Sequence, residues 1–419
     1  MKVLIVGSGG REHALGWKLS KSPRVSKLFF APGNAGTAAL GENVALSIDD
    51  LDGVAAFSRR EEIGLVVVGP DNALALGMCD VLAAAGIRSF GPGRVAAQFE
   101  SSKIFAKAFM TRHGIPTARS EAFSSSVDAH AAARSWKYPL VVKADGLALG
   151  KGVTIAHNPA DAAFAIHRAM DRAAFGSAGS RIVLEEFLEG RECSVHALVS
   201  GTSFVVFPDC RDHKHAFDGN QGPNTGGMGT VSPAPGVTDV ERERIVDEVI
   251  RPFVAGAQAE GIDFRGMLFP GIMMTVDGPK VLEFNCRFGD PETQVLMRRL
   301  ESDLLDLLDA TVDGRLDAVE PQWSANPSVC VVLASGGYPG SYRSGLPMDG
   351  LTVAGSQPGV EVFHAGTRAE GGRYLTAGGR VVGVTASAPS VDEARERAYQ
   401  AAACIHFENR MMRTDIGRI

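Results

Sequence analysis

The chain has 419 residues, of which 45% are hydrophobic and 21% are charged, and its formal net charge is −6. A domain takes roughly 100–200 residues, so this length predicts about two to four domains with sizeable cores. The acidic balance argues against a nucleic-acid binder, and no apolar run reaches the ~18 residues that would predict a membrane partner.

The six cysteines are scattered, and none forms a CxxC pair. This usage is typical of thiols in a reducing compartment and argues against a zinc site or a disulfide framework. The apolar run after Met1 leaves no room for a signal peptide, so we expect a cytoplasmic protein. The 49 glycines are clustered, which suggests phosphate-binding loops.

Short apolar runs alternate with helical stretches over residues 1–101, the first predicted domain. The runs end in Gly or Pro, and they lie at 2–6, 28–30, 65–68 and 87–90, with helical stretches at 12–20 and 73–85. This alternation predicts an open α/β sheet that binds ligands at the carboxyl ends of its strands.

The pattern changes to α+β over residues 102–318, the second predicted domain, with a lid subdomain at about 119–185. Helices are expected at 102–113, 238–261 and 293–310, and strands at 140–143, 182–186, 193–199, 203–207, 267–276 and 280–285. A third, smaller domain is expected at 319–419, with strands at 329–335 and 380–386 and a last helix at 392–405.

The motif GSGGREH at 7–13 follows a strand and opens a helix. A dinucleotide fingerprint would need glycine where Glu12 stands, which excludes a dehydrogenase. The remaining turn, with Gly9 and Gly10, suits a phosphate monoester held by free N–H groups at a helix N-terminus. A tight turn without a ligand is the alternative.

The motif VVKADGLALGKGV at 141–153 places Lys143 at the end of an apolar strand, beside a loop that contains Gly150 and Gly152. It is not a Walker A loop, but glycine N–H groups beside a fixed lysine suit phosphate binding. Lys103, before a helical stretch, is a candidate second cation for the phosphates. The alternative is a surface hairpin with solvated lysines.

The motif VLEFNCRFGDPE at 281–292 is the strongest single site. Glu283, Asn285 and Arg287 alternate, so a continuing strand would place them on one face. A carboxylate and an amide oxygen suit Mg²⁺ (or Mn²⁺) that bridges phosphates, and the planar guanidinium of Arg287 suits a carboxylate or phosphate. An exposed sheet face is the alternative.

Two further segments have the composition of binding loops. IVLEEFLEGRECS at 182–194 pairs a strand with acids, and a nucleotide could be held by backbone groups near Leu188 and by Glu192. The polar, glycine-rich stretch 212–229 is either disordered or ligand-binding. His213 and His215 lack a third ligand for zinc.

Together these segments resemble the phosphoribosylamine–glycine ligases, a family of ATP-grasp carboxylate–amine ligases. The resemblance runs in order along nearly the whole chain. It rests on GSGGREHAL (7–15), APGNAGT (31–37), FGP (90–92), SKIFAK (102–107), GIPTA (114–118), VVKADGLALGKGV, EEFLEG (185–190), DHK (212–214), GPNTGGMG (222–229), SPAP (232–235), EFNCRFGDPETQ (283–294) and RTDIG (413–417).

The resemblance implies an N-terminal α/β domain, an ATP-grasp core with a lid, and a small C-terminal domain. It implies that ATP phosphorylates glycine and that 5-phosphoribosylamine then attacks the glycyl phosphate, in a monomer or small homo-oligomer. The implied ATP-binding residues are Lys103, Lys143, Gly150, Gly152, Glu185, Glu186, Leu188 and Glu192, with Glu185, Glu186 and Leu188 at the adenine hinge. Glu283 and Asn285 are the implied metal ligands, and Lys143, Asp212 and Arg287 the implied catalytic residues. The implied substrate-binding residues are Gly9, Gly10, Asn224, Thr225, Gly226, Arg287 and Gly289.

Several positions depart from the family pattern. Arg211 and His215 flank DHK where Gln and Arg are usual, and Arg191 replaces an acid. Residues 69–77, Ser120 and Leu149 also differ. These departures leave room for a paralogue that uses another amino acid or amine. A nucleotide-binding regulatory protein without catalysis is a third hypothesis, against which the intact Glu283, Asn285 and Lys143 argue.

Overall fold

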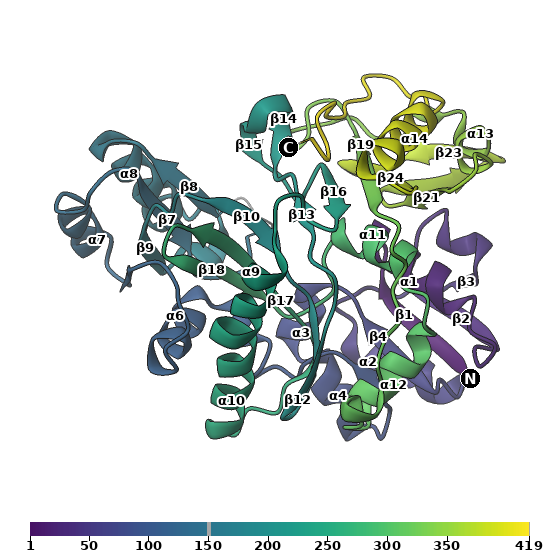
Figure 1. The fold of residues 1–419 in the computed structure, drawn as a ribbon, viewed down its shortest axis with the longest axis horizontal. Coiled ribbons are helices and arrows are strands. Elements are labelled where there is room, and N and C mark those ends of the chain that lie inside the picture. The colour runs from purple at the N-terminus through teal and green to yellow at the C-terminus, as the bar shows by residue number, and fades with distance from the viewer. Residues whose placement is uncertain (149–151, 419) are drawn as a thin grey trace.

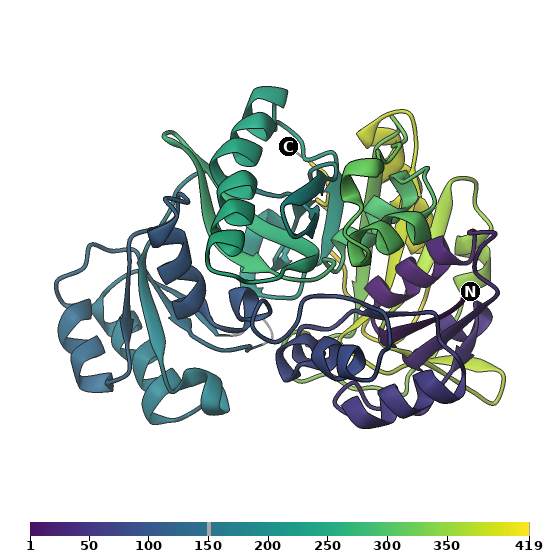
Figure 2. The ribbon, with the colours of Figure 1, turned by 90° about the horizontal axis from the view of Figure 1, so that it is seen from below.

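The computed structural model describes residues 1–148 and 152–418. Figure 1 shows the N-terminal and C-terminal domains on one side of the molecule and a small sheet with two helices at the other end. Figure 2 shows the same separation from below.

The N-terminal domain is the open parallel sheet that the alternating runs predict, with strand order β3-β2-β1-β4-β5. Its strands are β1 (Lys2–Gly7), β2 (Lys27–Pro32), β3 (Glu42–Asn43), β4 (Leu65–Val68) and β5 (Ser89–Phe90). Its helices are α1 (Gly10–Leu19), α2 (Leu51–Arg60), α3 (Asp71–Leu76) and α4 (Met78–Ala84). The single helix expected at 73–85 is wrong, because Gly77 takes φ +90° and separates α3 from α4.

We call the small outlying sheet, with strand order β6-β9-β7-β8, the lid sheet. Two short helices, α5 (Gln98–Ser101) and α6 (Lys103–Arg112), lead into it. It contains β6 (Ser120–Phe123), β7 (Leu140–Ala144), β8 (Val153–Ala156) and β9 (Ile182–Glu186), with α7 (Ser126–Ala133) and α8 (Pro159–Ile166). A cluster of small and aromatic side chains between the helices and the sheet forms its own core.

We call the five-stranded sheet built on the long strand β17 the central sheet. Its strands are β10 (Arg191–Ser194), β11 (Ala197–Ser200), β12 (Ser203–Val206), β17 (Arg265–Thr275) and β18 (Gly278–Asn285). The single strand expected at 193–199 is wrong, because β10 and β11 pair with different stretches of β17 and Val195 and His196 lie between them. The helix expected at 238–261 is confirmed as α9 (Asp239–Ile245) and α10 (Arg251–Ala259), joined by a π-helical turn at Val246–Ile250.

The third sheet mixes two parts of the chain. Its order β13-β16-β19-β24-β21 combines β13 (Arg211–Asp212) and β16 (Gly229–Ser232) with β19 (Ser328–Ala334), β21 (Val360–His364) and β24 (Arg380–Ser387). The remaining elements of the C-terminal part are β20 (Pro347–Met348), β22 (Thr367–Glu370), β23 (Arg373–Thr376), α13 (Leu351–Gly355) and α14 (Val391–Ala403). Within the 212–229 stretch, β14 (His215–Phe217) and β15 (Gln221–Asn224) form a hairpin, so this stretch is ordered.

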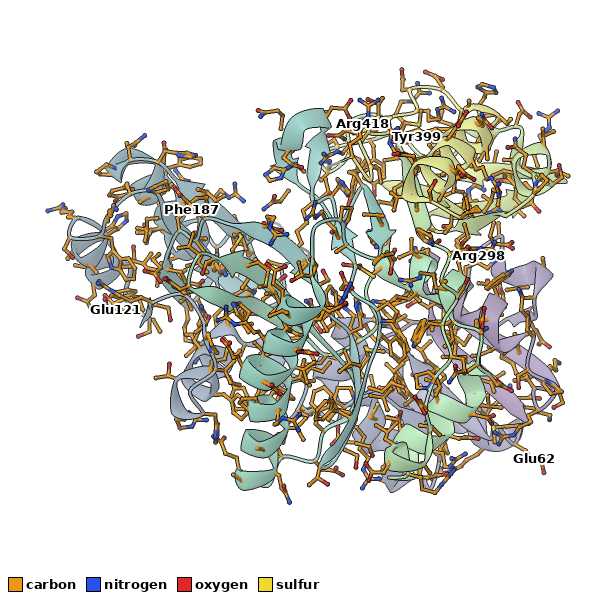
Figure 3. The ribbon with its side chains drawn as sticks, viewed as in Figure 1. Glu62, Glu121, Phe187, Arg298, Tyr399 and Arg418 are labelled. Carbon is orange, nitrogen blue, oxygen red and sulfur yellow. The ribbon has the colours of Figure 1, made fainter. Side chains whose placement is uncertain are left out.

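One continuous core joins the N-terminal sheet to helices α11 (Glu292–Arg299) and α12 (Leu304–Val312) and to Phe363 of the C-terminal domain. Figure 3 labels Arg298 at this junction, where its guanidinium lies 5.3 Å from the ring centre of Trp17 and donates to Gly359 O. The single helix expected at 293–310 is wrong, because the chain is extended at Leu300 and restarts at the capping residue Asp303.

Candidate active site

The segment that leads into β6 of the lid sheet meets the central sheet at a short parallel bridge between Thr117 and Val281. Beside this bridge, the apolar side chains of Ala118, Leu188, Met273 and Leu282 pack together. We call this group the apolar slot. Apolar surface between two sheets is the kind of environment in which a planar base packs.

Two lysines converge on one buried carboxylate next to the apolar slot. Oε2 of Glu185 lies 2.9 Å from Lys143 Nζ and 3.1 Å from Lys107 Nζ, and Glu185 is only 2% exposed. Lys143 also donates to the carbonyl oxygen of Leu282 at 3.0 Å. Glu185 therefore fixes the ammonium that was predicted to contact phosphates.

The Glu185 side chain faces the lysines; the place of this residue at the adenine hinge, which the resemblance implies, stays a prediction. The side chain of Glu186 faces elsewhere and accepts from Arg119 N at 3.0 Å. Sequence reasoning missed Lys107, although it lies four residues after Lys103 on α6, a spacing that places both on one helix face. Burial lowers the pKa of Lys107 to about 8, because the Glu185 carboxylate only partly offsets desolvation.

Lys103 is the first residue of α6, behind the capping residue Ser102. Its backbone N–H donates to Asp145 O at 3.1 Å, and its ammonium lies 3.5 Å from Gly146 O. The Asp145 carboxylate accepts from the Ser102 hydroxyl at 2.9 Å and so ties α6 to the start of the glycine-rich loop. Gly150 lies outside the described residues.

Glu283 and Asn285 lie at the end of β18, as predicted. Arg287 lies beyond the strand, so alternation along β18 accounts for only two of the three residues. The three are nevertheless brought together, because Arg287 Nη2 donates to Asn285 Oδ1 at 3.1 Å. Arg287 also pairs with Glu100 at 3.0 Å, a partner that sequence reasoning missed.

Glu283 is the carboxylate on which several cations converge. Burial alone would raise its pKa, but the positive charges of Lys214, Lys103, Lys143 and Arg287 outweigh burial and lower the pKa to about 2. Its carboxylate is therefore fully ionised at neutral pH, and 35% of the side chain is exposed. A charged, accessible oxygen donor beside an amide oxygen fits a hard divalent cation.

The described residues contain no cluster of three or more His, Cys, Asp or Glu side chains suited to a metal ion. Glu283 and Asn285 alone would provide only part of a coordination shell. Such a pair fits Mg²⁺ carried in by phosphates, since Mg²⁺ is usually bound by one or two carboxylates together with phosphate oxygens and water.

A second group of polar residues lies on the other side of Glu283. Lys214 Nζ is 3.7 Å from Glu283 Oε1, and a small open cleft is lined by Glu192, Asp212, Lys214 and neighbouring residues of β10, β17 and β18. Burial would lower the pKa of Lys214, but Glu283, Glu192 and Asp212 raise it. Lys214, within the DHK motif, was not predicted as a site residue.

Asp212 is the predicted catalytic residue in this cleft. Burial raises its pKa well above the ordinary value, and the nearby Glu292 carboxylate raises it further. Burial likewise raises the pKa of Glu292. Two neighbouring acids with elevated pKa values are candidates for proton transfer.

The predicted substrate loop at 222–229, with the predicted binding residues 224–226, packs beside Asp212. Thr225 donates to Lys214 O through its N–H (2.7 Å) and its hydroxyl (2.8 Å), while Asn224 pairs with His215 in the hairpin. Gly227 takes φ +110°, and a Cβ there would lie 2.6 Å from Asp212 Oδ1.

An arginine from the C-terminal domain completes this side of the site. Arg380 donates to Gly226 O and to Asp290 O (2.7 Å), and it lies 3.3 Å from Asp290 Oδ2. No motif marks Arg380, and its partners lie 90 or more residues away in the sequence. Sequence reasoning therefore had no signal for it.

The N-terminal glycine turn differs from expectation. Gly9 N–H already donates to Glu12 Oε2 at 2.6 Å, and the Asp290 carboxylate accepts from the Arg11 N–H. The turn is therefore capped by the protein's own acids and does not offer the full set of free N–H groups that a phosphate site was predicted to use. Gly10 is close enough that a Cβ would lie 2.5 Å from the Gln294 amide nitrogen.

Gly289 lies between two buried polar side chains. A Cβ at Gly289 would be 2.5 Å from Glu292 Oε2 and 2.9 Å from His196 Nε2. The His196 ring stacks on Phe269 with centroids 4.2 Å apart, and burial lowers its pKa to about 3. Gly289 is needed for this close approach.

Two of the residues that depart from the family pattern, Arg191 and Arg211, contact a turn outside the cleft. Arg191 donates to Gly236 O and pairs with Glu241 at 2.5 Å, while Arg211 donates to Pro235 O at 2.6 Å. Arg211 also donates to the backbone oxygen of Glu192 at 3.3 Å. Both arginines therefore hold the backbone around the cleft. Leu149 lies outside the described residues.

Three family models match consecutive parts of the chain. They describe the N domain (residues 1–100), the ATP-grasp (A) domain (101–293) and the C domain (328–419) of phosphoribosylglycinamide synthetase. The chain thus has the domains of a ligase of the ATP-grasp class, whose members use ATP.

Relatives that match the chain over nearly its whole length identify its family. A phosphoribosylamine–glycine ligase of Allochromatium vinosum is 52% identical over 420 residues, covering 100% of this chain and 98% of the relative, and one of Vibrio cholerae is 49% identical with the same coverage. The solved structure of the Thermotoga maritima enzyme of that name is 32% identical, with a TM-score of 0.86, and covers 99% of this chain and 100% of its own. The chain belongs to the phosphoribosylamine–glycine ligase family.

Proposed function

We propose that the protein joins glycine to 5-phosphoribosylamine with ATP, giving glycinamide ribonucleotide, ADP and phosphate in de novo purine biosynthesis. The family membership supports this proposal, and one structural observation carries it. Glu283, ionised by four surrounding cations, lies between the lysines beside the apolar slot and the Asp212 cleft. We infer from this that the phosphate-binding groups lie between the apolar slot, which takes the base, and the residues around Asp212, which take the acceptor.

Two substitution steps at neutral pH account for the need for ATP. A carboxylate is a poor acylating agent because oxide is a poor leaving group. A carboxylate oxygen of glycine attacks the γ-phosphorus, and the bond to the bridging oxygen of ADP breaks. The amine nitrogen then attacks the carbonyl of the acyl phosphate, loses a proton, and phosphate leaves with the bonding electron pair.

The nucleotide is assigned to the lid side of the site. The adenine packs in the apolar slot near Leu188, and Glu192 accepts from the ribose hydroxyls. Lys143, held by Glu185, and Lys103 at the start of α6 contact the phosphates. Fixed cations of this kind stabilise charge that develops during phosphoryl transfer without reorganising at the moment of reaction.

The divalent cation, Mg²⁺ or Mn²⁺, would be held by Glu283 and Asn285. Bound there with the nucleotide, it would neutralise phosphate charge. Asn285 is oriented for this role by Arg287, whose own guanidinium is fixed by Glu100.

The acceptor side is assigned to Arg287, Asp212 and the 222–229 loop. Arg287 binds the glycine carboxylate, because a planar fork fits two oxygens. Asp212, whose pKa is raised, accepts the proton that the attacking amine loses. The glycine turn at Gly9 and Gly10 remains a proposed contact for the substrate phosphate through the groups that the protein's acids leave free.

The other expectations stay proposals. We place the protein in the cytoplasm because all six cysteines are free thiols, and we expect a monomer or small homo-oligomer. Over residues 1–148 and 152–418, the structure has no helix of the length and apolarity that a bilayer crossing requires.

ADP release with glycine and freshly prepared phosphoribosylamine tests the proposal, against a panel of other amino acids and amines. Turnover with this pair is the expected result. Turnover only with another pair would favour the paralogue, and nucleotide binding without turnover under any condition would favour a regulatory protein.

Glu283→Ala is expected to abolish turnover in a folded protein, while substitution of the exposed Glu301 by alanine is the control. Near-normal activity of Glu283→Ala would remove the metal assignment.

A further inference from the structure

The closing segment Arg413–Gly417 has no part in the function proposed above. Arg413 is only 1% exposed and is among the largest fully buried side chains. Its guanidinium contacts Asp415 at 2.7 Å, the backbone oxygen of His215 at 3.1 Å and Asn220 Oδ1 at 3.0 Å. A buried arginine requires such compensation, and here much of it comes from the 213–220 stretch.

The neighbours of Arg413 contact the same stretch. Thr414 donates to the Asp218 carboxylate through its N–H at 2.7 Å and also through its hydroxyl. In return, Gly219 N–H donates to Asp415 Oδ2 at 2.9 Å. The closing segment therefore contacts the β14–β15 hairpin through both side chains and backbone.

The closing segment is itself fixed to α14. Tyr399 OH donates to Arg413 O at 2.9 Å and accepts from Ile416 N at 3.1 Å, and Arg395 donates to Thr414 O and Ile416 O. Figure 3 labels Tyr399 and Arg418 close together in the C-terminal domain, near the hairpin. The C-terminal domain thus provides a rigid support for the hairpin.

The hairpin needs such support because it is a separate two-stranded sheet. An isolated hairpin of two strands is marginally stable at best. This one contributes to the site, since Lys214 precedes β14 and Thr225, which bonds Lys214 O, follows β15. Any movement of the hairpin moves the ammonium that faces Glu283.

We propose that Arg413–Gly417 is a positioning element for the acceptor half of the active site. It holds the hairpin so that Lys214 stays beside Glu283 and Thr225 keeps the substrate loop beside Asp212. The expected loss of turnover rests on the proposed function, whereas the expected loosening of the hairpin does not. The Glu185 lysine cluster and the apolar slot belong to other sheets and do not depend on the closing segment.

Two variants test the contact from its two sides. Arg413→Lys removes the planar guanidinium while keeping the charge. Asp218→Asn weakens the contact with Thr414, and because Asp218 is exposed, this variant is expected to fold even if Arg413→Lys does not. The matched control is Arg410→Lys, because Arg410 donates only within the C-terminal domain, to Ala402 O and Ile405 O.

Amide hydrogen exchange gives the structural readout without any substrate. Residues 213–225 are expected to lose protection by at least about tenfold in Arg413→Lys and Asp218→Asn and to keep it in Arg410→Lys. Unchanged exchange in both test variants, or an equal loss in the control, overturns the proposal even if the enzyme is active.

Kinetics give the functional readout. The kcat/KM for glycine and phosphoribosylamine is expected to fall about 10- to 100-fold, because a displacement of about 1 Å can cost this much. Binding of metal-free ADP, measured by calorimetry, should change less than about twofold. Looser exchange with unchanged kcat/KM, or an equal loss of ADP affinity, refutes the positioning role. Absent turnover in the wild type would instead refute the proposed function and leave the exchange result to stand.

Discussion

Glu185 is the residue at which the structure makes its sharpest energetic prediction. Its carboxylate lies 2.9 Å and 3.1 Å from two ammonium groups, those of Lys143 and Lys107, and all three side chains are at least nine-tenths buried. Glu185→Gln keeps the shape but removes the carboxylate that both ammonium groups contact. Removing one partner of a buried ion pair costs about 3–5 kcal/mol, which is the expected loss in free energy of unfolding at pH 7.

The size of this loss should depend on pH. Burial already lowers the pKa of Lys107 to about 8, whereas in an unfolded chain it is about 10.4. Without Glu185 the folded pKa falls further, so the lysine in the folded variant gives up its proton below pH 8. Between pH 7 and 9 the unfolded lysine stays protonated, and the stability deficit of the variant therefore shrinks as the pH rises.

Urea unfolding of the wild type and of Glu185→Gln at pH 7 and pH 9 measures both effects. Glu186→Gln is the matched control, because this neighbouring acid is half-buried and accepts a hydrogen bond from a backbone N–H; it should change stability by less than about 1 kcal/mol. A loss below about 1 kcal/mol in Glu185→Gln, or a deficit that grows with pH, would refute the reasoning about this cluster.

Three further predictions concern the site and the domain junction. Arg287→Lys should lower kcat/KM at least about tenfold, because an ammonium cannot bridge both the Glu100 carboxylate and the Asn285 amide that the guanidinium contacts. Unchanged kinetics would count against this bridging role. Gly227→Ala should lose most activity in a folded protein, because φ is +110° and the new Cβ would lie 2.5 Å from Pro291 Cδ; full activity would show that the loop adapts freely. His13 and His364, which meet between the N-terminal and C-terminal domains, have pKa values lowered by burial to about 3 and about 4. Their contribution is therefore complete above pH 6.5 and is lost as the pH falls, by about 2 kcal/mol each at pH 5. The double variant with glutamine at both positions should lose less free energy of unfolding between neutral pH and pH 5, by the sum of these two contributions, as measured by urea unfolding. An unchanged dependence on pH would refute the role of these two histidines.

Family and site chemistry could be predicted from local motifs. The Lys143 strand end and the Glu283–Asn285 pair both lie within short, continuous segments, and the structure brings them into one region. The points at which long predicted helices and strands are interrupted could not be predicted from the sequence pattern. The helix expected at 293–310 has an apolar pattern throughout, yet the chain turns at 300–303, where Asp303 accepts from Ser22 Oγ at 2.6 Å.

The sequence by itself determined the class of protein and the order of its domains, and it predicted candidate residues for binding phosphates and metal. These follow from periodicity and from motifs in which the partners are a few residues apart. Only the tertiary structure decided that Glu185 faces lysines, that Arg380 reaches the substrate loop and that Arg413 holds the hairpin. The physical reason is that a buried charge must find a partner wherever packing places one. The partners named here lie 42 to 198 residues away in the chain, although Arg413 also contacts Asp415 two residues away.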